Sequence, residues 1–148
     1  MTEGIIVAWL HYIGIMLLLA SLLAEHLLLK PQPTLAEAKT LQVVDIIFGA
    51  SAAVVLITGI LRMFLEKGTS YYLHHGAFHI LLTLFVVVGL LSIYPTVVFL
   101  RWRADTRLGR APNLPFVQFR KLQMIMRVEM TLLLLAPLFA AWMARGIW

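Results

Sequence analysis

Four long apolar segments set the strongest limit on what this chain can fold into. They run from Ile5 to Leu29, from Leu41 to Leu65, from Tyr72 to Leu100 and from Leu122 to Ala144. Each is longer than the roughly 20 residues that an α-helix needs to cross the hydrocarbon core of a bilayer. Lipid offers the backbone no hydrogen-bond partners, so such segments form helices rather than open strands. The sequence therefore predicts an all-α membrane protein, with residues 1–148 forming a single domain that folds as a four-transmembrane-helix bundle.

The composition agrees with a membrane location. The chain is 61% hydrophobic and 13% charged, whereas soluble domains are about 45–50% apolar and about 25% charged. The first segment has no Lys or Arg before it and is too long for a cleaved signal peptide, so we expect a retained span. The absence of cysteine excludes disulfides, thiolate metal sites and covalent haem attachment.

Basic residues predict the orientation and the charged partner. The loop between the third and fourth segments, with its flanks, contains Arg101, Arg103, Arg107, Arg110, Arg120 and Lys121, and the first loop contains Lys30 and Lys39. Cytoplasmic loops are enriched in Lys and Arg. We therefore expect the N- and C-termini on the periplasmic side of a bacterial inner membrane. The net charge of +5 then indicates contact with an anionic lipid bilayer and no nucleic acid.

Histidines in the outer half of the predicted bundle form the first candidate site. His11 and His79 lie six or seven residues into their spans, which is roughly 10 Å at about 1.5 Å per residue. Two imidazoles at one depth can be the axial ligands of a haem b iron, and Arg62 could pair with a haem propionate. His75 is the alternative ligand, because its spacing from His79 places both on one helix face. A mononuclear metal site at His11, His75 and His79, or ordinary packing roles for all of them, are the alternatives.

A second cluster of ionisable residues is expected in the inner half. It contains Glu25, His26, Asp45, Arg127 and Glu129. Ionisable groups within a membrane span are costly and usually face the bundle interior. One interpretation is an ion-pair network in which Arg127 pairs with Asp45 or Glu25. The other is a proton path, because Glu25 and His26 could exchange protons near neutral pH.

Nearly the whole chain resembles a family of small bacterial membrane proteins that is classified as a domain of unknown function. The resemblance lies in residues 8–30, 66–103 and 120–146, and its most specific parts are Lys67-Gly68, Tyr72-Leu73-His74 and Tyr94-Pro95. More distantly, the chain is similar to the J-type protoporphyrinogen IX oxidases, whose early histidine corresponds to His11. A later histidine of that family corresponds to His79, but Leu81 stands where the family has lysine. This similarity implies tetrapyrrole chemistry.

The resulting functional hypothesis is a haem b-binding redox protein of the inner membrane, linked to a tetrapyrrole or a quinone as an oxidoreductase. Two alternatives stay open: an accessory subunit without a cofactor, and a small proton-coupled transporter. Four spans enclose little volume, so we also expect a homo-oligomer or a subunit of a membrane complex. No motif identifies a catalytic residue.

Overall fold

The computed structural model describes residues 1–146, and this part of the chain is helical without any strand. The helices are α1 (Thr2–Leu28), α2 (Leu35–Leu65), α3 (Thr69–Leu73), α4 (Gly76–Arg101), α5 (Arg103–Arg107) and α6 (Phe116–Ala144). Within these residues, four helical segments are long and apolar enough to cross a membrane: α1, α2, α4 continued by α5, and α6. This confirms the prediction of an all-α protein with four helices that are long and apolar enough to span a membrane.

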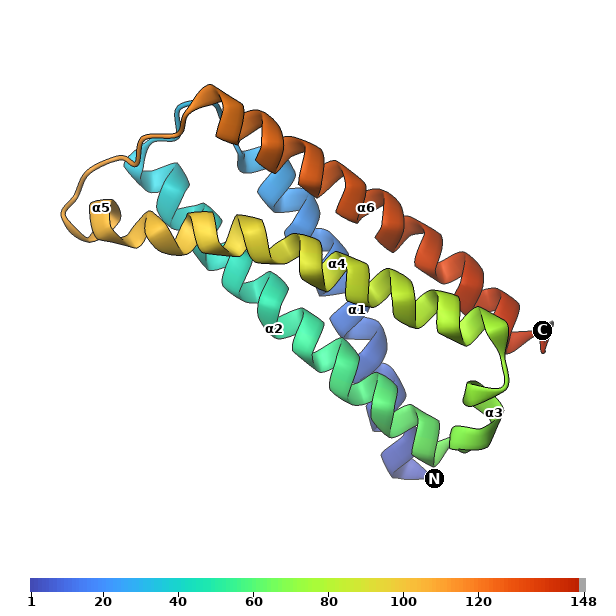
Figure 1. Ribbon diagram of the computed structural model, residues 1–148. Helices are drawn as coiled ribbons and strands as arrows, with labels where there is room; N and C mark the ends of the chain where they lie inside the picture. Colours follow the sequence, from blue (N-terminus) through green and yellow to red (C-terminus); the bar gives the residue numbers. More distant parts are fainter. Residues whose placement is uncertain (147–148) are drawn as a thin grey trace.

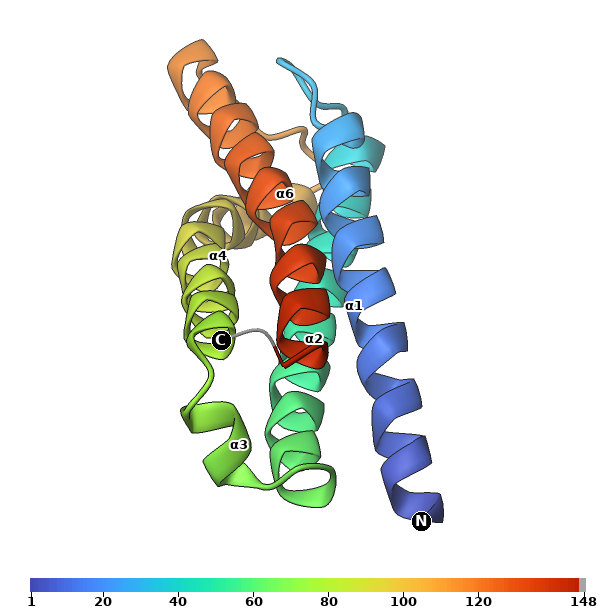
Figure 2. The same cartoon turned by 90° about the vertical axis from the view of Figure 1, so that its right-hand side faces the viewer.

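The four long helices form two antiparallel hairpins (Figures 1 and 2). The first hairpin is α1 with α2, which pack against each other more extensively than any other pair, and the second is α4 with α6. The hairpins meet where α6 packs on α1 and α4 packs on α2. Within residues 1–146, α1 and α4 do not pack against each other, and Figure 2 shows them on opposite sides of the bundle.

The bundle has two chemically different ends. The end that contains α5 and the α1–α2 loop is called the basic end here, because Lys30, Lys39 and the arginines of residues 101–110 lie there. The opposite end contains α3, the start of α1 and the end of α6 (Figure 1). It is called the histidine end, because His11, His74, His75 and His79 lie in that half.

Local chemistry explains why α2 starts earlier than the predicted Leu41. The backbone N–H of Glu37 donates to the Thr34 hydroxyl at 3.2 Å, and that hydroxyl donates to the Glu37 carboxylate at 3.1 Å. Such a cap satisfies a backbone N–H group that a helix start leaves without a partner. The long helix α2 therefore begins directly after Thr34.

The predicted third span is interrupted near its start. α3 ends at Leu73, and α4 begins only at Gly76. His75 between them has extended backbone angles, φ −99° and ψ 119°. Its ring Nδ1 donates to the Tyr71 carbonyl at 2.6 Å, the carbonyl that the His75 N–H would bond in a continuous helix. The prediction that His75 and His79 share one helix face is therefore wrong.

Burial is concentrated in the half of the bundle nearest the basic end. The most deeply buried large side chains are Leu22, Leu41, Phe99, Leu122, Met126, Glu25 and Glu129. All buried residues of α6 lie in its first half, up to Glu129. Many large apolar side chains cover the outside of the helices, as a lipid environment requires. The tight core therefore surrounds the acidic residues rather than the histidines.

Candidate functional site

Three carboxyl groups from three helices are buried in the core of the bundle. Glu25 on α1 is 2% exposed, Asp45 on α2 is 7% exposed, and Glu129 on α6 is 1% exposed. The α1–α2 hairpin supplies two of them, and α6 brings the third across from the other hairpin. We call these three residues the acid cluster.

The fourth long helix contributes a hydroxyl group to the acid cluster. Thr96 on α4 donates a hydrogen bond from Oγ1 to Oδ1 of Asp45 at 3.0 Å. Glu25, Asp45 and Glu129 lie near enough to one another for their charges to interact. All four membrane-spanning helices therefore meet at the acid cluster.

A hydrogen bond between Glu25 and Asp45 would require a proton. Two ionised carboxylates are both acceptors, so they can bond to each other only if one is protonated. Because Asp45 also accepts the Thr96 hydroxyl, the arrangement fits Glu25 as the donor and Asp45 as the acceptor. Three buried carboxyls that are this close cannot all be ionised without a neutralising cation.

No cation neutralises the acid cluster within residues 1–146. The ion pairs of that region are Lys30–Glu37, Arg62–Glu66 and Arg110–Asp105. Arg127 is exposed, so the expected pair of Arg127 with Asp45 or Glu25 does not form. One oxygen of Glu25 and one of Glu129, both Oε1, are buried without a hydrogen-bond partner.

His26 lies next to the acid cluster. It follows Glu25 on α1, is half-buried, and its Nδ1 is buried without a hydrogen-bond partner. Its charged neighbour is Arg127 on α6. The structure thus brings together all five residues expected in this half, but as an acid cluster flanked by His26 and Arg127 rather than as an ion-pair network.

His11, in the other half, is held by the first hairpin alone. Its Nδ1 lies 2.8 Å from Oγ1 of Thr58 on α2, and the Thr58 hydroxyl donates to the carbonyl of Val54 at 2.5 Å. Since that hydroxyl proton is already used, Nδ1–H of His11 is the donor to Thr58, and Nε2 retains its lone pair. Gly59 makes room for the ring, because a Cβ atom there would lie 3.3 Å from Cε1 of His11.

The other two candidate ligands are bound to nearby backbone. His79 is exposed, and its Nε2 donates to the carbonyl of Leu73 at 2.8 Å, while His75 bonds the Tyr71 carbonyl from Nδ1. Both lie on the side of α3 and α4, and α4 does not pack against α1, which carries His11. Within residues 1–146, no group of three or more His, Cys, Asp and Glu residues is arranged to hold a metal ion.

Arg62 is engaged by an acid at the end of its own helix. Nε and Nη2 of Arg62 donate to Oε1 and Oε2 of Glu66 at 2.5 and 3.1 Å. The hydrogen bond from Arg62 holds the pKa of Glu66 below its usual value. The Tyr72 hydroxyl also donates to Oε2 of Glu66 at 3.2 Å, and burial, followed by the Glu66 charge, raises the pKa of Tyr72. The guanidinium is therefore already paired in a bidentate bond.

Two threonines that complete these sites were not singled out by the sequence. Thr96 reaches Asp45, and Thr58 orients His11. Threonine is common in membrane helices because its hydroxyl can bond the backbone carbonyl four residues earlier, as Thr58 does. One sequence feature sets Thr96 apart: it directly follows Pro95 within a long apolar segment.

The whole bundle, acid cluster included, falls within one family of membrane proteins. A model described as "Predicted membrane protein (DUF2214)" matches residues 3–147. The chain belongs to this family. The predicted membership of a membrane protein family of unknown function is thus confirmed. No curated protein and no solved structure shows significant similarity to this DUF2214 member, and the suggested likeness to protoporphyrinogen oxidases finds no support in these comparisons.

Proposed function

We propose that this DUF2214 protein is a small proton-coupled membrane transporter in which the acid cluster binds and releases the proton. The observation that carries the proposal is the close approach of the buried Glu25 and Asp45 carboxyls, which have no basic partner within residues 1–146. A buried carboxyl pair of this kind holds a proton that can leave only with a change in its surroundings. Proton relays in membrane pumps and transporters are commonly built from such intramembrane acids.

The acid cluster lies where the two hairpins meet, so its protonation affects how the hairpins pack. Glu25 and Asp45 belong to the first hairpin, and Glu129 belongs to the second. When the cluster is protonated, the hairpins are joined by the Thr96–Asp45 hydrogen bond and by the contacts around Leu122 and Met126. Loss of the proton leaves like charges on both sides of the junction, and these repel strongly in a low-dielectric interior. Proton release therefore favours separation of the two hairpins.

An apolar cavity lies at the same junction, toward the middle of the bundle. Its volume is about 170 Å³, and it is lined by residues of α1, α2 and α4, including Leu18, Phe48, Phe85 and Val88. Ser92 supplies a hydroxyl-bearing side chain to its wall. A hairpin separation driven from the acid cluster would enlarge this cavity first. The transported solute is therefore expected to be small and largely apolar.

The experiment measures protonation and proton movement separately. Infrared pH titration of the purified protein should show the C=O stretch of a buried protonated carboxyl near neutral pH, and Glu25→Gln should remove it. In vesicles that enclose a pH-sensitive dye, an imposed membrane potential should drive proton entry that Glu25→Gln and Glu129→Gln abolish. Glu3→Gln is the matched control, because Glu3 is exposed near the start of α1. Absence of the carboxyl band, or proton entry unchanged in both variants, would disprove the proposal.

Haem b binding is the second candidate, and one observation favours it. The Thr58 contact leaves the Nε2 lone pair of His11 free, and metal-binding histidines are typically oriented by a hydrogen bond from the other ring nitrogen. Such a protein would exchange electrons with a quinone or act on a tetrapyrrole in the bacterial inner membrane. His79 is the weaker ligand of the two, because its Nε2 already donates to Leu73.

The colour of the purified protein tests this second candidate. Protein expressed with added haem precursor should show a Soret band that shifts on reduction, and His11→Ala should remove it. His74→Ala is the control, since His74 is exposed and was not proposed as a ligand. A colourless preparation refutes haem binding and leaves the proton hypothesis untouched, because the acid cluster does not include His11.

A further inference from the structure

A second cavity lies at the basic end and is unrelated to the acid cluster. Its volume is about 330 Å³, and its walls are Lys39 and Gln42 on α2 with Arg103, Thr106 and Arg107 on or beside α5. This volume falls at the lower end of the range for small-molecule sites, about 300–1,000 Å³. Three of its five residues are basic, and none is acidic. We call it the basic pocket.

Hydrogen bonds between α2 and the α4–α5 segment fix the floor of the basic pocket. The Gln42 amide Nε2 donates to the carbonyl of Phe99 at 3.2 Å and to the Thr106 hydroxyl at 3.4 Å. Thr106 is 5% exposed, and Trp102 beside it is 4% exposed and belongs to the hydrophobic core. The pocket is thus anchored to the packed part of the bundle rather than formed by loose loop residues.

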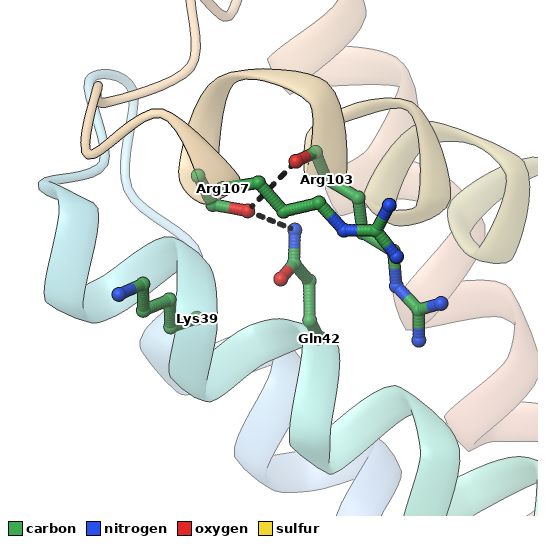
Figure 3. Close-up of a pocket in the computed structure, with 5 residues that line it drawn as sticks. Lys39, Gln42, Arg103 and Arg107 are labelled. Carbon is green, nitrogen blue, oxygen red and sulfur yellow. Dashed lines mark hydrogen bonds between the residues drawn. The ribbon is translucent and has the colours of Figure 1, made fainter.

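The basic side chains of the pocket have no anionic partner on the described part of the chain. The ion pairs within residues 1–146 do not include Lys39, Arg103 or Arg107. Asp105, the nearest acid in sequence, pairs with Arg110 instead, at 3.6 Å. Arg103 and Arg107 are four residues apart, so they share one side of the helical turn. Figure 3 shows both guanidinium groups extending to the same side of Gln42, with the Lys39 amine on the other side.

We infer that the basic pocket binds a phosphate group, with the two guanidinium groups as the main ligands. Two like charges on one side of a helix repel each other, and a phosphate between them removes that repulsion while accepting charge-assisted hydrogen bonds. Lys39 lines the same pocket and can add a third positive charge from α2. The pocket lies beside the ends of membrane-spanning helices, where the headgroup of an anionic lipid would be within reach.

A phosphate could come from an anionic lipid or from a soluble phosphate, so the experiment compares the two. Short-chain phosphatidylglycerol, short-chain phosphatidylcholine and inorganic phosphate are titrated into the purified full-length protein. We expect phosphatidylglycerol to bind, phosphatidylcholine to bind at least tenfold more weakly, and inorganic phosphate to compete with phosphatidylglycerol. Binding of inorganic phosphate without phosphatidylglycerol would identify a soluble ligand for the same site. Equal binding of both lipids, or no binding by either anion, would overturn the inference.

A pair of double variants separates the pocket from general surface charge. Arg103→Gln with Arg107→Gln should weaken phosphatidylglycerol binding at least tenfold. Arg110→Gln with Arg120→Gln removes the same charge from exposed positions outside the pocket and should change binding less than twofold. Equal losses in the two double variants would show a diffuse electrostatic effect and contradict a built site.

The wild-type protein provides a test that does not depend on the folding of any variant. Phenylglyoxal modifies accessible arginines, and mass spectrometry of peptides identifies the modified positions. Saturating phosphatidylglycerol should slow modification of Arg103 and Arg107 severalfold and leave Arg110 unchanged. Uniform protection of all three arginines, or protection of none, would contradict the proposed site.

Discussion

Thr96 and Asp45 join the two hairpins through a hydrogen bond of 3.0 Å between a hydroxyl on α4 and a carboxyl on α2. The bond is made to Asp45, whose charge interacts with those of Glu25 and Glu129, and each of these glutamates has a buried oxygen without a hydrogen-bond partner. It therefore connects the stability of the bundle to the protonation of the acid cluster, because Asp45 can accept it in either protonation state but accepts it best when ionised.

Removal of this hydroxyl should destabilise the protein. Thr96→Val keeps the shape of the side chain but leaves an Asp45 oxygen without its donor, which costs about 1–3 kcal/mol. Thr83→Val on the same helix is the control, because its exposed hydroxyl bonds only the carbonyl of His79. Unfolding in a detergent–denaturant series measures both, and equal stability of the two variants would contradict the role given to Thr96.

Two glycines should respond in opposite ways to the same substitution. A Cβ atom on Gly14 would lie 3.0 Å from Cγ2 and 3.5 Å from the backbone nitrogen of Val55, whereas one on Gly49 would meet nothing within 4 Å. Val55 is buried and has a stiff β-branched side chain, so it cannot move aside. Gly14→Ala should cost about 1–3 kcal/mol of stability, and Gly49→Ala should be neutral or stabilising by up to about 1 kcal/mol. Thermal unfolding of both variants distinguishes these outcomes.

Adjacent leucines on α1 provide a matched pair for the core. Leu22 is 0% exposed and Leu23 is 44% exposed, so only the first leaves a cavity when it is shortened. Leu22→Ala should destabilise the bundle by about 2–5 kcal/mol, while Leu23→Ala, which faces lipid, should cost well under half as much. A reversed order in denaturant unfolding would show that α1 is rotated from the orientation described above.

The Glu66 carboxylate should make the histidine end sensitive to acid. The hydrogen bond from Arg62 lowers the pKa of Glu66 from the usual value of 4.5. A depressed pKa adds stability that is complete above pH 4.5 and disappears as the pH falls through the lower folded value. The stability difference between wild type and Glu66→Gln should therefore shrink as the pH is lowered below 4.5. A difference that stays constant across that range would contradict the Arg62–Glu66 contribution.

The orientation predicted from the basic loops is directly measurable, because the chain contains no cysteine. Single substitutions Ser70→Cys and Ala111→Cys place a thiol at exposed positions on the two ends of the bundle. If both termini are periplasmic, a membrane-impermeant maleimide should label Cys at position 70 in intact cells. Position 111 should be labelled only after the membrane is opened. Labelling of position 111 but not of position 70 in intact cells would show the opposite orientation.

The helical spans were predictable from sequence because long apolar runs have one physical solution in lipid. The ends of these helices were harder to predict. The second apolar segment begins at Leu41, so the predicted span left out the polar residues Lys39 and Thr40 just before it. The helix continues through them because Lys39 and Thr40 point away from the core. The break after Leu73 contains no proline, so the sequence did not indicate it. At this break the His75 ring donates to the Tyr71 carbonyl, which in a continuous helix would accept the backbone N–H of His75.

The members of the candidate sites were predictable, but their partners were not. Depth along each span placed Glu25, Asp45 and Glu129 in the same half of the bundle, and the structure brings them together. Depth also matched His11 with His79, yet their helices do not pack against each other. Sequence spacing gives the height of a residue in the membrane but not the rotation of its helix. That rotation decides whether Arg127 faces the acids or the surroundings.

The division into two hairpins also has a consequence for how the chain is inserted into the bilayer during synthesis. The first hairpin leaves the ribosome first and carries Glu25 and Asp45 together, so each acid enters the lipid with a partner that can share its proton. Glu129 arrives later on α6, without an acid or a base beside it, and obtains its neighbours only when the second hairpin docks. The entry of α6 into the lipid before it docks is therefore the step of insertion with the largest polar penalty, and docking relieves that penalty.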